Sequence, residues 1–226
     1  MKRNSISNIC RDDRSQHLTQ ALVFHEAGHA AAIYLNNRAR NLPPVYFEIV
    51  FEDLSDAHVG ALLSYQAPHD DAIARVEGGR LIQSLPYSLD GAPQKSMERN
   101  IALTPLDKEY ETAFEADVIN LLVGPLAEAT HVHHRDDEVF NGRLVDLKSL
   151  YNYGGASDLA LVREYLECFS ENKERQDEKL HELFIEANKF IGDSSNWRAI
   201  TKLAHYILES NKNTISFDEV VFVLGS

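Results

Sequence analysis

Apolar residues crowd the chain between Leu18 and Leu35, where polar positions are too few to form a fully solvated helical face. The pattern predicts a helix that other elements cover on most sides. Thr19 is a candidate N-cap, and Asn36-Asn37 is a candidate stop. Gly28 lies inside this helix, where glycine costs about 1 kcal/mol relative to alanine. We therefore expect a strand, a substrate or another packed element to approach closely there.

Two strands are expected after this helix. Val45–Phe51 follows a Pro-Pro break and is rich in β-branched and aromatic residues, and His58–Tyr65 is the second candidate. A strand beside the helix could hold an extended peptide by main-chain hydrogen bonds, or it could simply cover the helix. Proline and glycine then interrupt residues 66–104, which predicts short helices and loops, with one helical piece at Asp70–Val76.

The remainder of the chain favours helices. Glu109–Thr130 carries a helical apolar pattern in which Gly124-Pro125 predicts a kink or a break into two helices. A short final element begins at Ile215, after three further helices at Ser157–Phe169, Asp177–Ile191 and Asn196–Ser210. The predicted fold is mainly α with a small β-sheet next to the first helix. We expect a single domain over residues 1–226, with residues 1–17 as a flexible N-terminal segment.

One apolar stripe has two interpretations. The helix at Asn196–Ser210 carries Leu203, Tyr206, Ile207 and Leu208, which could face a second copy of the chain in a homo-oligomer. Packing into the protein's own core is the commoner use of such a stripe.

The first helix contains His25-Glu26-Ala27-Gly28-His29, a His-Glu-x-x-His motif. Two histidines four positions apart point from one helical face, so both imidazoles can reach one metal ion. Glu26 can turn its carboxylate toward a water in an open metal position and take its proton as general base. A chance match to this pattern is expected on the order of a few per cent of the time.

A catalytic zinc usually takes three protein ligands, so a third must come from elsewhere. His131, His133 and His134 cluster near a predicted helix end, where histidines are most often solvated or interact with the helix dipole. Asp158 follows Gly154-Gly155, which allow a tight turn, and Ser157 could cap the helix that Asp158 begins. Helix-start aspartates are more often caps than ligands, so the residues alone leave both candidates open.

Composition narrows the classes of partner. With 22 basic and 35 acidic residues the net charge is -13, and the pI is near 5.2, so nucleic acid and anionic membrane are poor partners. Cys10 and Cys168 form no Cys-x-x-Cys pair, so a metal would be held by nitrogen and oxygen ligands. The sequence shows neither a secretory signal nor an apolar run of the roughly 20 residues needed to span a bilayer, nor a phosphate-binding loop. A cytoplasmic location without its own ATPase is the expectation.

These motifs together resemble the peptidase domain of the FtsH-type membrane AAA proteases. Four segments are similar to that family in order along the chain: Phe24–Ala30, Leu122–Glu128, Gly154–Leu159 and Trp197–Ala204. Departures accompany the resemblance. Pro125 stands where the family has arginine and Ser157 where it usually has asparagine, and residues 66–104 form a segment longer than the family needs.

The resemblance implies a zincin-type fold and a specific site. Its third zinc ligand falls on Asp158, so His25, His29 and Asp158 are expected to hold Zn²⁺ while Glu26 acts as general base in peptide-bond hydrolysis. Peptides or unfolded proteins are the implied substrates, a separate ATPase is a candidate partner, and the family's ring of six suggests a homo-oligomer. The alternatives are a peptidase fold that binds a partner peptide without cleaving it, and an interaction protein without metal.

Overall fold

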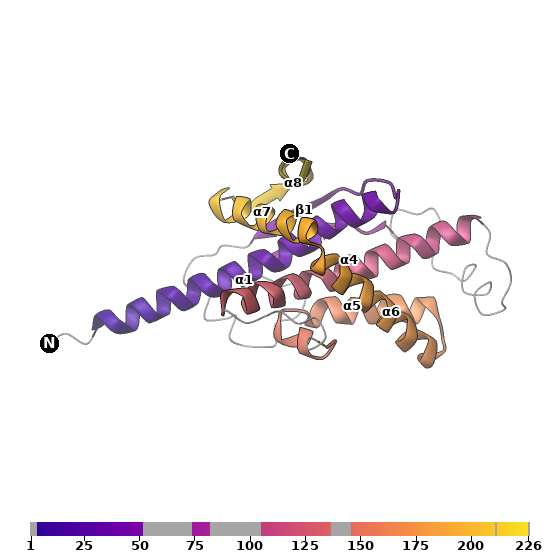
Figure 1. Ribbon diagram of the computed structural model, residues 1–226, viewed down its shortest axis with the longest axis horizontal. Helices are drawn as coiled ribbons and strands as arrows, with labels where there is room; N and C mark the ends of the chain where they lie inside the picture. Colours follow the sequence, from indigo (N-terminus) through magenta and orange to yellow (C-terminus); the bar gives the residue numbers. More distant parts are fainter. Residues whose placement is uncertain (1–3, 52–73, 82–104, 137–145, 211, 226) are drawn as a thin grey trace.

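The computed structural model describes residues 4–51, 74–81, 105–136, 146–210 and 212–225 (Figure 1). Within these ranges the chain is mainly helical, with six α-helices and a small antiparallel sheet of three strands, which confirms the predicted class. The helices are α1 Asn4–Ala39, α4 Pro105–Arg135, α5 Ala156–Phe169, α6 Lys173–Gly192, α7 Ser194–Ser210 and α8 Phe217–Gly225. None of the helices in the described part of the chain combines the length and apolar character needed to cross a bilayer.

Helix α1 is longer than its apolar pattern predicts. It runs from Asn4 to Ala39, and its N-terminal end projects beyond the rest of the protein (Figure 1). The expected cap at Thr19 is wrong, because the backbone before it is already helical. The expected stop at Asn36-Asn37 is also wrong, since both side chains are buried and hydrogen-bonded to Asn120 of α4 inside the helix pair. The flexibility of residues 1–17 stays a prediction.

The core is organised around α1 and α4, which lie side by side and antiparallel (Figure 1). Their direction follows from two contacts, His25 with Glu128 near one end and Arg40 with Glu115 near the other. A Cβ atom on Gly28 would lie 2.7 Å from the Cβ of Ala127, so the close approach expected at this glycine is made by a packed helix. Burial of many small and branched side chains between the two helices stabilises the pair.

Helix α4 is continuous from Pro105 to Arg135, and the expected break at Gly124-Pro125 does not occur. Proline removes one backbone hydrogen bond and crowds the preceding turn, at a typical cost of about 3 kcal/mol. The residues on either side, Val123 and Leu126, are fully buried. Tertiary packing along α1 therefore holds the helix through a residue that would interrupt an isolated helix.

The sheet has the order β2-β1-β3, with β1 Phe47–Phe51 in the centre, β2 Ala74–Gly78 and β3 Thr214–Ser216, and it contacts α1. The first expected strand is thus confirmed. The helical piece expected at Asp70–Val76 is wrong in its last three residues, because Ala74–Val76 pair antiparallel with Ile49–Phe51. The expected strand at His58–Tyr65 and most of segment 66–104 lie outside the described residues.

The C-terminal helices pack onto the α1 and α4 pair, α7 against α1 and α6 against α4. Helix α6 begins after Asn172, whose side chain accepts a hydrogen bond from the Arg175 amide as an N-cap. In α7, Leu203 and Ile207 are buried in the core, as the intramolecular interpretation of the apolar stripe predicts. A homo-oligomer stays a prediction.

The junction between β3 and α8 supplies a test of the fold. Glu219 accepts hydrogen bonds from Lys212, Tyr206 and the Ser216 amide, and the Ser216 hydroxyl accepts one from the Glu219 amide, which is a capping box. The bonds from Lys212 and Tyr206 lower the Glu219 pKa from 4.5 to about 2. The ionised form is therefore favoured by folding, and its stabilising effect is present above pH 4.5 and lost as the pH falls toward 2.

We predict that Glu219→Gln lowers the free energy of unfolding at pH 7 by about 1 kcal/mol, the usual value of a helix cap, and that this difference from wild type vanishes toward pH 2. Denaturant unfolding as a function of pH measures both effects. Glu178→Gln, at an exposed glutamate on α6, is the control. Equal loss in both variants, or a difference that persists at low pH, contradicts the capping role.

Candidate metal centre

Three side chains converge where α1, α4 and α5 meet. His25 and His29 project from the same face of α1, and Asp158 comes from the first turn of α5. The two Nε2 atoms lie 3.1 Å apart, Asp158 Oδ2 lies 3.2 Å from His25 Nε2, and Asp158 Oδ1 lies 3.2 Å from His29 Nε2. Ligands of a tetrahedral ion bound at about 2.1 Å are separated by about 3.4 Å. The group could therefore hold a metal ion with very little rearrangement.

Each imidazole is oriented by a partner on α4. His25 Nδ1 lies 2.9 Å from Glu128 Oε2, and His29 Nδ1 lies 2.9 Å from the backbone carbonyl oxygen of Asn120. Donation from Nδ1 of each ring leaves its Nε2 atom, which lies 3.2 Å from an Asp158 oxygen, available to a metal ion. Metal-bound histidines in proteins are usually held by carboxylate or carbonyl partners of this kind.

Asp158 is placed by a tight turn. Gly154 has a φ of +67°, in the left-handed region that glycine adopts without penalty, and Gly155 packs against the Pro125 ring and the Leu150 carbonyl. The N-cap of α5 is Gly155 without a side-chain hydrogen bond, so the expected cap by Ser157 is wrong. Asp158 Oδ2 is buried and makes no hydrogen bond within the described structure, although it faces His25 Nε2. An orphaned carboxylate oxygen beside an imidazole lone pair suits a pair of ligands to one cation.

Glu26 lies within the same buried region. Its residue is 4% exposed. Burial raises the pKa of this carboxyl group, with the nearby histidines opposing the shift. A buried carboxyl group with a raised pKa beside two histidines is suited to exchange a proton.

The charges of the site interact strongly. Burial lowers the pKa of each histidine, but neighbouring carboxylates outweigh burial and raise both pKa values. The contacts with Asp158 and Glu128 and the charges of Asp158 and Glu26 raise that of His25, whereas the charge and contact of Asp158 and the charge of Glu26 raise that of His29. Burial raises the pKa of Asp158, but the two imidazoles hold it well below its usual range. The buried group therefore favours a positive charge at its centre, which protons or a metal ion can supply.

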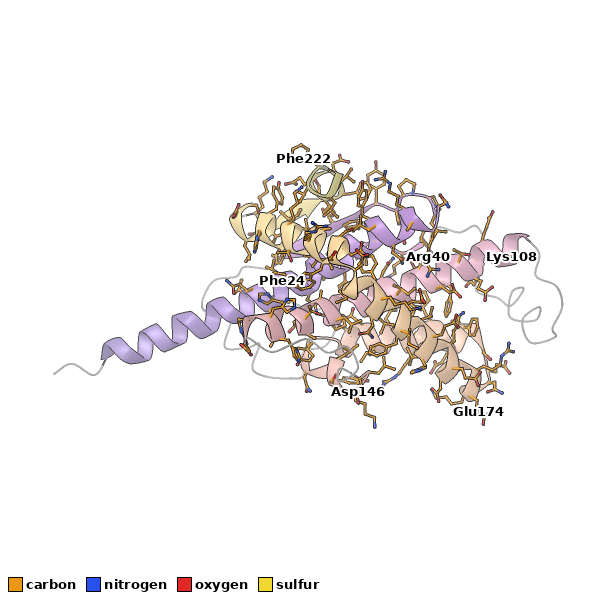
Figure 2. The ribbon with its side chains drawn as sticks, in the orientation of Figure 1. Phe24, Arg40, Lys108, Asp146, Glu174 and Phe222 are labelled. Atoms are coloured by element: carbon orange, nitrogen blue, oxygen red, sulfur yellow. The ribbon has the colours of Figure 1, made fainter. Side chains whose placement is uncertain are left out.

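The cluster of His131, His133 and His134 is not part of this group. The His131 ring stacks on Phe24 at a centroid distance of 3.9 Å, His133 bonds the Ala129 carbonyl, and His134 meets the edge of Trp197. Phe24 lies where α1 and α4 pack together, one residue before His25 (Figure 2). These histidines are thus used in packing and helix-end contacts.

Sequence reasoning did not assign roles to three residues of the centre. Glu128 lies in the segment Leu122–Glu128 that resembles the family. It follows Gly124 by four positions, so both residues lie on one helical face, and this spacing was the available signal. Asn120 acts on His29 through its carbonyl, which every residue carries, so no side-chain pattern could reveal it. A Cβ on Gly124 would lie 2.6 Å or less from three atoms of the His29 imidazole, so this glycine makes room for the ligand.

Comparisons with known proteins identify no relative: no family model, no curated protein and no solved structure matches the chain. What stands is a mainly helical fold with a buried His25, His29 and Asp158 group that could hold a metal ion.

We predict that Gly124→Ala weakens metal binding at least 10-fold, because the added methyl group displaces the His29 ring from its place beside the other ligands. Alanine would otherwise favour a helix by about 1 kcal/mol. Competition with a chromophoric chelator measures the affinity for Zn²⁺. Gly192→Ala is the matched control, since a Cβ there meets nothing within 4 Å. Wild-type affinity in a folded Gly124→Ala protein contradicts the steric argument.

Proposed function

We propose that the protein is a zinc-dependent metallopeptidase, similar to the peptidase domain of the FtsH-type proteases. The observation that carries the proposal is the convergence of His25 Nε2, His29 Nε2 and the Asp158 carboxylate, with Glu26 buried beside them. Three nitrogen and oxygen ligands leave one coordination position for water, which is typical of catalytic and not of structural zinc sites. The same donor set also suits non-haem Fe(II), but a buried carboxylate base favours hydrolysis.

Zn²⁺ held by these residues would act as a Lewis acid that polarises a carbonyl and acidifies water. The protein's own contribution is to place and use protons. Glu26, with its raised pKa, is suited to accept a proton from water and to return it to a leaving amine. Glu128 and the Asn120 carbonyl keep the two imidazoles in the orientation that metal binding needs.

The charge of the site favours a neutral substrate. Glu26 and Glu128 flank the ligands, and together with Asp158 they bring three carboxylates to a dipositive ion. A phosphoryl group would be repelled by these carboxylates, whereas a peptide carbonyl carries no charge until the reaction begins. Peptides and loosely folded proteins are thus the proposed substrates. Supply by a separate ATPase and assembly into a ring belong to the same proposal.

The alternative is a peptidase fold that binds a peptide partner without cleaving it. The observation in its favour is that His25, Glu26, His29 and Asp158 are each 9% exposed or less. A metal buried to this degree could serve chiefly to join α1 to α5.

The first test is metal analysis of protein purified without a histidine tag, for wild type and Asp158→Ala. We predict about one zinc per chain in wild type, and loss or sharp weakening in the variant, because two histidines alone make an incomplete site. Elemental analysis by mass spectrometry identifies the metal at the same time. Zinc retained fully by Asp158→Ala would exclude this aspartate as a ligand, and a folded wild-type protein that binds no metal would remove the enzymatic proposal.

The second test separates the two functions. Glu26→Gln should reduce cleavage of an unfolded protein or a peptide library by at least about 100-fold, the usual contribution of a general base. Zinc content and thermal stability should stay at wild-type values, because Glu26 is not a ligand. Cleavage at the wild-type rate in this variant rules out Glu26 as the base. Absence of any cleavage by metal-loaded wild type supports the binding module.

A further inference from the structure

A layer of three asparagines lies between α1 and α4, next to the metal centre. Asn36 Nδ2 donates to Asn120 Oδ1 at 3.0 Å, and Asn120 Nδ2 donates to Asn37 Oδ1 at 3.1 Å. All three residues are 9% exposed or less. Arg40 donates to Asn36 Oδ1, which extends the layer toward the end of the helix pair marked by Arg40 in Figure 2. We call Asn36, Asn37 and Asn120 the amide layer.

Asn120 is tied to α1 at two levels. Its carbonyl oxygen accepts the His29 Nδ1 hydrogen bond, and its side chain joins Asn36 and Asn37 two turns further along α1. Positions 29, 36 and 37 share one helical stripe. A single residue of α4 therefore fixes both the orientation of a metal ligand and its own position along α1.

At its closest point the contact between the helices is made by small residues, with Gly28 of α1 against Ala127 and Gly124 of α4. Such small side chains allow close approach but offer few knobs and holes that would resist sliding. Buried amides do resist it, because a shift by one turn, about 5.4 Å, would leave their donors and acceptors unsatisfied. Buried asparagines set helix register in coiled coils by the same means.

Register matters to the site because both orienting partners belong to α4. A shift of α4 would withdraw the Asn120 carbonyl from His29 and the Glu128 carboxylate from His25 at once. We propose that the amide layer sets the register of α1 against α4 and thereby positions His25 and His29 for metal binding. The proposal rests on the metal-binding part of the proposed function, and it makes the three asparagines positioning residues.

The test compares two variants with wild type and a control. Asn120→Ser is too short to bridge Asn36 and Asn37, and the triple variant N36L/N37L/N120L removes every amide without leaving one unpaired. Asn188→Leu is the control, since Asn188 is a partly buried asparagine on α6, a helix that supplies no residue of the amide layer or of the His25, His29 and Asp158 group. For each protein we measure thermal unfolding, Zn²⁺ affinity by chelator competition, and the visible spectrum of bound Co²⁺, which reports ligand geometry.

We expect 10- to 100-fold weaker Zn²⁺ binding in both variants, with an altered Co²⁺ spectrum. The triple variant should unfold at or above the wild-type temperature, because well-packed aliphatic side chains commonly replace buried polar groups without loss. Loss of affinity without loss of stability is the result that a merely structural role would not give. Wild-type affinity and spectrum in either folded variant overturn the proposal. So does failure of both to fold when Asn188→Leu folds, since the layer would then serve folding alone. Absence of metal binding in wild type instead removes the proposed function.

Discussion

The close contact between α1 and α4 is the constraint on which the rest of the structure depends. Gly28 lets the two backbones approach until Ala127 fills the space, and Gly124 leaves room for the His29 ring between them. The positions of the other residues of the site depend on this contact. Helix α4 supplies the partners of both histidines, and Pro125 packs against the turn that carries Asp158. A larger distance between α1 and α4 would leave room for larger side chains, but it would separate His25 and His29 from the groups that orient them.

Sequence patterns within a few residues predicted the features that depend on neighbouring residues alone. The His25 and His29 pair follows from helical spacing, and the helices at the C-terminal end follow from their apolar periodicity. Asp158 needed a resemblance, because an aspartate at a helix start looks the same whether it caps or binds a metal. Pairing of Ala74–Val76 with β1 was missed, since a strand partner lies outside any local window. The uninterrupted course of α4 through Pro125 was missed because packing, and not propensity, decides it.

The site also shows a conflict between stability and use. Burying Glu26 and Asp158 near two imidazoles costs desolvation energy that an apolar core of the same volume would avoid. Most of the helical interface is apolar and well filled, so the charged group stands out against its surroundings. Natural sequences commonly break the rules of core design only where a site requires it. The buried charged group includes His25, Glu26 and His29, which are also the residues of the His-Glu-x-x-His motif.

The turn at Gly154 has a consequence for the order in which the molecule assembles. His25 and His29 come before Glu128 along the chain, and Asp158 follows both. Contacts of such long sequence separation form only after the intervening segments have been enclosed, at a cost in loop entropy. A growing chain thus holds two histidines without a complete centre until α4 has packed on α1 and α5 has docked. The His25, His29 and Asp158 group can form only after α5 has been made and has packed against α4.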